Sequence, residues 1–155
     1  MSLIASILPR ANVVAEFNVT SKKRVFEEAA LLFEAQLGLA RSAVFEKLFA
    51  RERLGSTGLG DGVAIPHCRV EGLNEITGAF IRLAAPISFD AFDDERVRLI
   101  FVLLAPCDAN DAHLNVLAEL AQMFSNPTLR EQLLAAADAD ALHALLIKEA
   151  PQDTP

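Results

Sequence analysis

The stretch VRLIFVLLAP, Val97–Pro106, is apolar at nearly every position. A strand with one face on solvent alternates apolar and polar residues, whereas a continuous apolar run is typical of a strand buried on both faces. Pro106 cannot donate to a sheet ladder and is expected to stop the run. The stretch therefore predicts a central strand over Val97–Leu104, which needs a layer of helices on each face of its sheet.

Other strand and helix patterns alternate along the chain on either side of this central strand. Short apolar runs predict strands at Val13–Phe17, Val63–Ile65, Ile76–Leu83 and Ile87–Phe89. Helical spacing, caps and glycine stops predict five helices: from a Thr20 or Ser21 cap to Gly38, from a Ser42 cap to Gly55, around Leu117–Phe124, from Asn126 and Pro127 onward, and over Ala139–Lys148. Interleaved strands and helices predict an α/β fold, a single-domain α/β/α sandwich over residues 1–150, with 151–155 as a disordered tail.

The composition narrows the class of protein. The chain has 155 residues and a net charge of −7, and it lacks Trp and Tyr. Because a negative protein is repelled by a phosphate backbone and has few stacking platforms without these aromatics, we expect no nucleic-acid partner. No apolar run reaches the ~18 residues of a membrane span, and the amino terminus lacks the basic start of a signal peptide. We therefore expect a cytoplasmic protein with no membrane insertion.

The segment GSTGLGDGVAIPH, Gly55–His67, combines four glycines with a closing Pro-His pair. Glycines let a backbone turn tightly and approach a ligand, which suits an anion. Asp61 and Gly62 follow the GxxxxG spacing where a nucleotide-binding P-loop requires Lys and Ser or Thr, so a nucleotide is not expected. We expect Pro66 to end the preceding strand and His67 to lie at its carboxyl end. A neutral imidazole there is a candidate nucleophile for phosphorus, although a lone histidine is often only structural.

Four other residues are candidates for the surroundings of His67. Arg51 continues the apolar stripe of its helix and can reach an anion, or it can offset the negative end of that helix. His113 falls on the inner face of the first turn of the next predicted helix, where it is either a site residue or a core histidine. The hydroxyls of Ser56 and Thr57 can bind phosphate oxygens or cap the turn.

These residues belong to motifs that resemble a known family. RERLGSTGLGDGVAIPH (51–67), ISFDAFDDERV (87–97) and AHLNVLAELAQMF (112–124) are together similar to the enzyme IIA domains of the fructose/mannitol family of the bacterial phosphoenolpyruvate-dependent phosphotransferase system (PTS), and most of all to its nitrogen-regulatory branch. The resemblance implies a mixed sheet between helical layers. It also implies that His67 accepts a phosphoryl group from a histidine-containing phosphocarrier protein of HPr or NPr type, with Arg51 and His113 completing the site.

The resemblance also sets the expected role and its rivals. A free-standing domain of this kind is expected to regulate partner proteins by its phosphorylation state, with potassium-transport or sensor-kinase proteins as candidate targets. It needs no cofactor, and no turnover of a small molecule is expected. A sugar-specific IIA component that passes phosphate to a IIB domain is the close rival. A hydrolase using His67 and His113 as a pair belongs to a different class.

Cys68 departs from the family pattern, which generally has glycine or another small residue after the histidine. Phosphoryl transfer is expected to survive because the sulfur is compact. The two cysteines, Cys68 and Cys107, follow predicted strand ends near His67 and His113, which leaves a zinc-binding module as a remote alternative. The usual paired spacing of zinc ligands is missing, and small half-buried packing is the plain alternative for both thiols.

Overall fold

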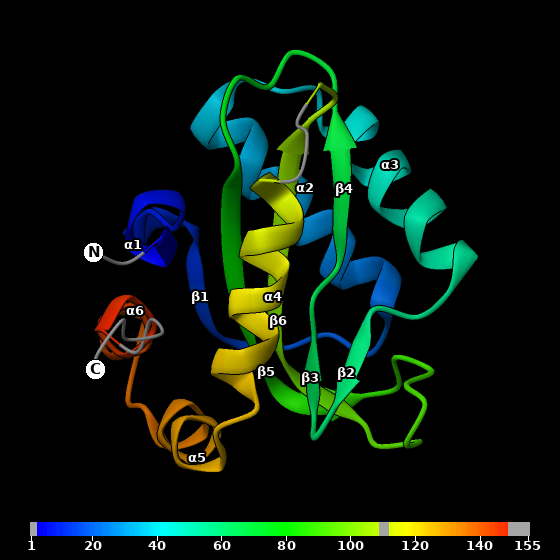
Figure 1. Ribbon diagram of the computed structural model, residues 1–155. Helices are drawn as coiled ribbons and strands as arrows, with labels where there is room; N and C mark the ends of the chain where they lie inside the picture. The colour runs from blue at the N-terminus through cyan, green and yellow to red at the C-terminus, as the bar shows by residue number, and fades with distance from the viewer. Residues whose placement is uncertain (1–2, 109–111, 149–155) are drawn as a thin grey trace.

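The structure is a computed structural model that describes residues 3–108 and 112–148. Its centre is a mixed sheet in the order β1-β5-β6-β3-β2, with β4 also paired to β6 (Figure 1). β3 and β4 follow one another along the same side of β6, and both run parallel to it. The strands are β1 (Val13–Phe17), β2 (Gly58–Gly60), β3 (Val63–Ala64), β4 (His67–Val70), β5 (Thr77–Ile87) and β6 (Val97–Pro106).

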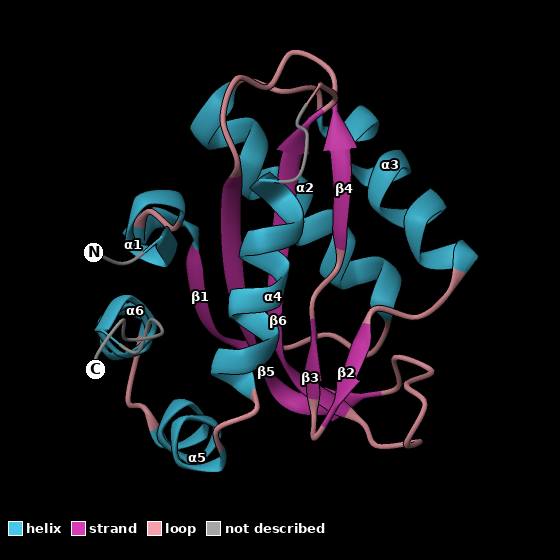
Figure 2. Ribbon diagram, in the orientation of Figure 1, coloured by secondary structure: helices cyan, strands magenta, loops and turns pink. Residues whose placement is uncertain are grey.

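Helices cover both faces of this sheet, which confirms the predicted sandwich (Figure 2). Helices α1, α4, α5 and α6 pack on one face, and α2 and α3 pack on the other. A short 3₁₀ helix, Arg10–Asn12, leads into β1. The helices are α1 (Leu3–Ile7), α2 (Lys22–Leu37), α3 (Arg41–Leu54), α4 (Ala112–Phe124), α5 (Pro127–Ala135) and α6 (Ala139–Lys148).

β6 is the central strand that its sequence predicts. Its side chains alternate between the two cores: Phe101 and Leu103 pack toward α4, whereas Ile100 and Val102 pack toward α2 and α3. All four are at most 1% exposed. Because β5 flanks β6 on one side and β3 and β4 on the other, the backbone of this strand is paired along both edges.

Several predicted elements are confirmed at their ends. Ser21 caps α2 by accepting a hydrogen bond from the Arg24 N–H, and Gly38 ends the helix with a left-handed φ of 73°. Asn126 caps α5, with Pro127 in its first turn. The helix predicted over Ala139–Lys148 has those bounds.

Other expectations were wrong in instructive ways. α3 begins at Arg41 rather than after a Ser42 cap, and the carboxylate of Glu34 on α2 accepts the Arg41 N–H. The two strands expected at 76–83 and 87–89 form one strand, β5, with a register shift before Ile87. α1, the 3₁₀ helix and β2 were not predicted. Residues 151–155 lie outside the described residues, as does the end of the expected domain.

The glycine segment forms a small hairpin instead of an open loop. β2 and β3 pair antiparallel around a turn at Asp61 and Gly62, both of which have positive φ. A Cβ atom on Gly58 would lie 2.7 Å from the Cβ of Ala91, so this position has no room for a side chain. These glycines therefore serve chain packing and turning.

Candidate functional site

A pocket of about 550 Å³ lies where α3, β4, the end of β6 and the start of α4 meet. The pocket brings together Arg51, His67 and His113, three residues that the sequence singles out. Lys47 and Arg69 also line it, and none of the described lining residues is acidic. The pocket is therefore a local concentration of positive charge on a chain whose net charge is −7.

His67 begins β4 directly after Pro66. The expectation that His67 lies at the carboxyl end of a strand was wrong: β3 stops at Ala64, before Pro66, and His67 is the first residue of β4, which continues along β6. The ring Nδ1 lies 2.8 Å from the Ile65 carbonyl oxygen. Because a carbonyl oxygen only accepts, Nδ1 carries the proton and Nε2 keeps a lone pair.

The surroundings of His67 favour its neutral form. Burial, the largest cause, lowers the pKa of His67 below its usual value of 6.5. Arg51 and His113 act in the same direction, whereas the hydrogen bond to Ile65 and the Glu52 carboxylate oppose them. A neutral, half-buried ring that lines the pocket is suited to act as a nucleophile at neutral pH.

The position of Arg51 fits both roles that the sequence left open. It lies in the last turn of α3, and its Nη1 donates to the Gly55 carbonyl oxygen at 2.9 Å, so it satisfies the carboxyl end of the helix. The same side chain lines the pocket with His67. Lys47, one turn earlier on α3, adds a second cation to that wall.

The opposite wall pairs Arg69 of β4 with His113 of α4. The Arg69 Nη2 lies 3.3 Å from Nε2 and 3.4 Å from Nδ1 of His113, and Arg69 Nη1 donates to the Cys107 carbonyl oxygen at 3.1 Å. In a strand, residues two apart share a face, so Arg69 lies on the same face as His67. Sequence reasoning missed Arg69 because it ended the strand at Pro66; continued alternation through His67 was the signal that could have found it.

A known protein family matches most of the chain. Residues 6–149 match the family described as "Phosphoenolpyruvate-dependent sugar phosphotransferase system, EIIA 2". The chain belongs to this family. The resemblance stated from the motifs is thereby confirmed, and the mixed sheet between helical layers is the fold it implied.

Relatives of this EIIA domain include nitrogen-regulatory proteins. The crystal structure of IIA-Ntr from Neisseria meningitidis superposes with a TM-score of 0.89 at 52% identity, covering 94% of this chain and 99% of the other. The nitrogen regulatory protein of Pseudomonas aeruginosa is 44% identical over 128 residues, which are 82% of this chain and 83% of the relative. The fructose-specific EIIA component of Haloferax volcanii is 35% identical over 106 residues, 68% of this chain and 69% of the relative.

Two predicted phosphate ligands of the EIIA domain have other partners. The Ser56 hydroxyl donates to the Phe89 carbonyl oxygen at 2.6 Å and accepts the Gly58 N–H at 3.1 Å, which is the turn-capping alternative. The Thr57 hydroxyl donates to a carboxylate oxygen of Glu52 at 2.6 Å. Neither residue, nor any of the four glycines, is among the described residues that line the pocket.

The thiols of the EIIA domain give little support to a metal site. Cys68 lines the pocket, but burial raises the pKa of its thiol to about 12, which opposes the thiolate that zinc requires. Cys107 is exposed. Among residues 3–108 and 112–148, no group of three or more His, Cys, Asp and Glu side chains is arranged to hold a metal ion.

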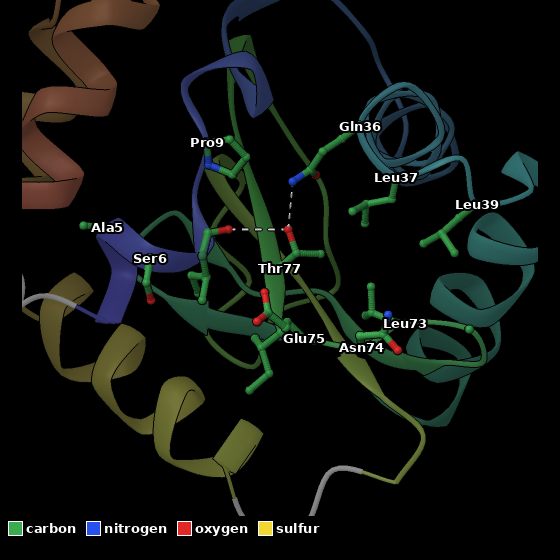
Figure 3. A pocket seen from close by; sticks show the side chains of 13 residues that line it. Ala5, Ser6, Pro9, Gln36, Leu37, Leu39, Leu73, Asn74, Glu75 and Thr77 are labelled. Carbon is green, nitrogen blue, oxygen red and sulfur yellow. Dashed lines mark hydrogen bonds between the residues drawn. The ribbon is translucent and has the colours of Figure 1, made fainter.

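A larger cavity of the EIIA domain, about 680 Å³, lies between α1, the end of α2 and the turn before β5 (Figure 3). Gln36 Nε2 donates to the Thr77 hydroxyl, which in turn donates to the Ile7 carbonyl oxygen. No Lys, Arg or His is among the described residues that line this cavity, so it offers an anion no cation.

None of the described helices is long and apolar enough to cross a membrane.

Proposed function

We propose that this chain is a regulatory phosphoryl carrier of the PTS. His67 accepts a phosphoryl group from a phosphocarrier protein of HPr or NPr type, and the phosphorylation state of His67 controls binding to regulated partner proteins. The observation that carries the proposal is the pocket in which His67, with its Nδ1 bound to the Ile65 carbonyl oxygen, lies with three cations and a second histidine.

The transfer needs no cofactor. As Nε2 of His67 attacks, a new P–N bond forms while the P–N bond of the donor's phosphohistidine breaks, and its electron pair returns to the donor ring. The Nδ1 proton of His67 stays in place, and the Ile65 carbonyl oxygen stabilises it as the ring becomes more positive. Arg51 and Arg69 offset the negative charge of the arriving phosphoryl group, with the His113 ring beside Arg69.

The rim of the pocket fits a protein as the donor. Leu54, which lines the pocket, is 85% exposed, and Leu114, next to His113 on α4, is 53% exposed. Exposed apolar side chains beside a site are typical of a surface that a protein partner covers. The charged pocket beside Leu54 holds the proposed acceptor, His67.

The regulatory role rests on the relatives. The relatives from Pseudomonas aeruginosa and Neisseria meningitidis are both named as nitrogen regulatory proteins and align with most of this chain. Potassium-transport and sensor-kinase proteins remain the candidate targets. Precipitation of partners from a cell extract with wild type and with His67→Ala, each incubated with and without phosphoenolpyruvate, tests whether partner binding follows the phosphorylation state.

A sugar-specific IIA component is the second candidate, favoured by the similarity to the fructose-specific component of Haloferax volcanii. Such a protein passes its phosphoryl group rapidly to a IIB domain. Transfer from the phosphorylated chain to purified fructose and mannitol IIB domains separates the two roles, because fast transfer to either would replace the regulatory proposal.

His67→Ala tests the acceptor itself. After incubation with enzyme I, phosphocarrier and phosphoenolpyruvate, the wild type should carry one acid-labile phosphate, and the variant should carry none while keeping its circular-dichroism spectrum. His143→Gln is the matched control, because His143 lies on α6 and its Nε2 donates to the Leu8 carbonyl oxygen, which glutamine can also do. Phosphate on His67→Ala would overturn the assignment.

A further inference from the structure

The proposed transfer leaves one buried charge beside the pocket unexplained. Glu52 follows Arg51 on α3 and is only 6% exposed. Its Oε1 accepts the Thr57 hydroxyl at 2.6 Å, and its Oε2 accepts both the Thr57 backbone N–H and the Lys22 ammonium at 3.0 Å. A buried carboxylate is costly to desolvate, and replacing such an ion pair with apolar residues is often neutral or stabilising. We therefore looked for a role of the Glu52 carboxylate other than stabilising the fold.

The Glu52 network, defined as Glu52, Thr57 and Lys22, closes the chain around the end of α3. Both hydrogen bonds to Thr57 span five residues, and Gly55 lies within that span. The Gly55 carbonyl oxygen is the acceptor that holds the Arg51 guanidinium at 2.9 Å. Fixing Thr57 therefore fixes the acceptor on which Arg51 rests.

Lys22 ties this closed segment to the rest of the fold. Its ammonium lies 3.0 Å from Glu52, 3.4 Å from the Asp90 carboxylate and 5.0 Å from the centre of the Phe89 ring. The Ser56 hydroxyl donates to the Phe89 carbonyl oxygen, and this hydrogen bond is a second link between the end of α3 and Phe89. The end of α3 is thus held against the first turn of α2 and the loop between β5 and β6.

We propose that Glu52 and Thr57 are positioning residues for Arg51, which they hold toward His67 through the Gly55 carbonyl oxygen. The inference rests on the proposed function for its role in transfer. Its geometric content, that Arg51 is held near His67 by the Glu52–Thr57 hydrogen bonds, stands independently of that function and can be measured on unphosphorylated protein.

A double-mutant cycle tests the role in transfer. Thr57→Val keeps the side-chain shape but removes the hydroxyl, and it should slow phosphoryl acceptance about tenfold by displacing Arg51. Thr57→Ser keeps the hydroxyl and should restore the wild-type rate. In an Arg51→Ala background, Thr57→Val should change the rate less than about twofold, because the residue it positions is gone. A purely structural role would give the same loss in both backgrounds and would overturn the proposal.

An NMR titration of the His67 ring is the second test, because it measures the pKa of His67. Arg51 lowers the pKa of His67, so displacing Arg51 should raise that pKa in Thr57→Val, and Thr57→Val should add nothing to the rise seen in Arg51→Ala. An unchanged His67 pKa in Thr57→Val would contradict the positioning role. If Thr57→Val does not fold, Glu52→Gln replaces it in the kinetic cycle.

The two readings separate the failure of each proposal. A wild type that accepts no phosphate while the His67 pKa still responds to Thr57→Val would overturn the proposed function and leave the positioning of Arg51 supported. Normal phosphoryl acceptance in Thr57→Val, with an unchanged His67 pKa, would overturn the positioning and leave the function supported.

Discussion

The two neighbouring strands β6 and β4 make opposite uses of the same sheet. Leu103 and Leu104 of β6 lie in register with His67 and Cys68 of β4. Every residue from Leu99 to Ala105 is at most 2% exposed, whereas Val70 alone is buried on β4. The buried strand supplies a backbone that is covered on both faces, and the short strand beside it presents His67 and Arg69 to the pocket. The buried strand and the strand that lines the pocket are thus direct neighbours in the sheet.

The largest expected effect on stability lies on the buried strand. Phe101→Ala should lower the free energy of unfolding by about 3–5 kcal/mol, because the ring packs with Phe80 and Phe124 and its removal leaves a cavity. Urea denaturation measures the change. Leu54→Ala, at an exposed site of the pocket rim, should stay within about 0.5 kcal/mol of wild type. Similar losses for both variants would erase the contrast between core and site.

The next effect lies on the pocket wall and concerns rate. Arg51→Ala should reduce the rate of phosphoryl acceptance on the order of 10²-fold, because it removes a cation from the developing charge. Arg53→Ala is the matched control: Arg53 belongs to the same helical turn but lies over the Phe49 ring, 5.4 Å from its centre. Single-turnover transfer from phosphorylated phosphocarrier measures both rates, and equal rates would reduce Arg51 to a helix-end residue.

The pH dependence sharpens the comparison from the side of β4. Burial lowers the pKa of His67, so the nucleophilic neutral form should persist below pH 6.5 and be lost only as the pH falls through the lowered value. The same shift means that the folded state binds its proton less readily than the unfolded chain, so this ring costs stability as the pH falls below 6.5. NMR titration of the ring measures the midpoint, and one at or above 6.5 would contradict the environment described for His67.

The smallest effect is expected at Cys68. Cys68→Ala should leave phosphoryl acceptance within about twofold of wild type, since the thiol makes no step of the transfer. The raised pKa of about 12 also predicts that iodoacetamide at pH 7.5 labels the exposed Cys107 well before Cys68. Mass spectrometry over a time course measures the order of labelling. Modification of Cys68 before Cys107 would contradict the burial described for the Cys68 thiol.

Local signals predicted most of the elements. Ser21, Gly38 and Asn126 lie where their cap chemistry places them, because a cap acts on backbone groups two to four residues away. The start of α3 was missed because Glu34, on another helix, supplies the hydrogen bond there. The glycine segment was misjudged for the same reason: the contact of Gly58 with Ala91 comes from a loop more than 30 residues away.

By itself the sequence determined the α/β class and the central strand, and it singled out His67 as a candidate nucleophile, because periodicity, caps and residue chemistry act over a few positions. Tertiary structure alone decided that Arg51, His67, Arg69 and His113 share one pocket, and that Ser56 and Thr57 turn their hydroxyls elsewhere. Those outcomes depend on how α3, β4 and α4 pack against one another, and such long-range contacts leave no local trace in the order of residues.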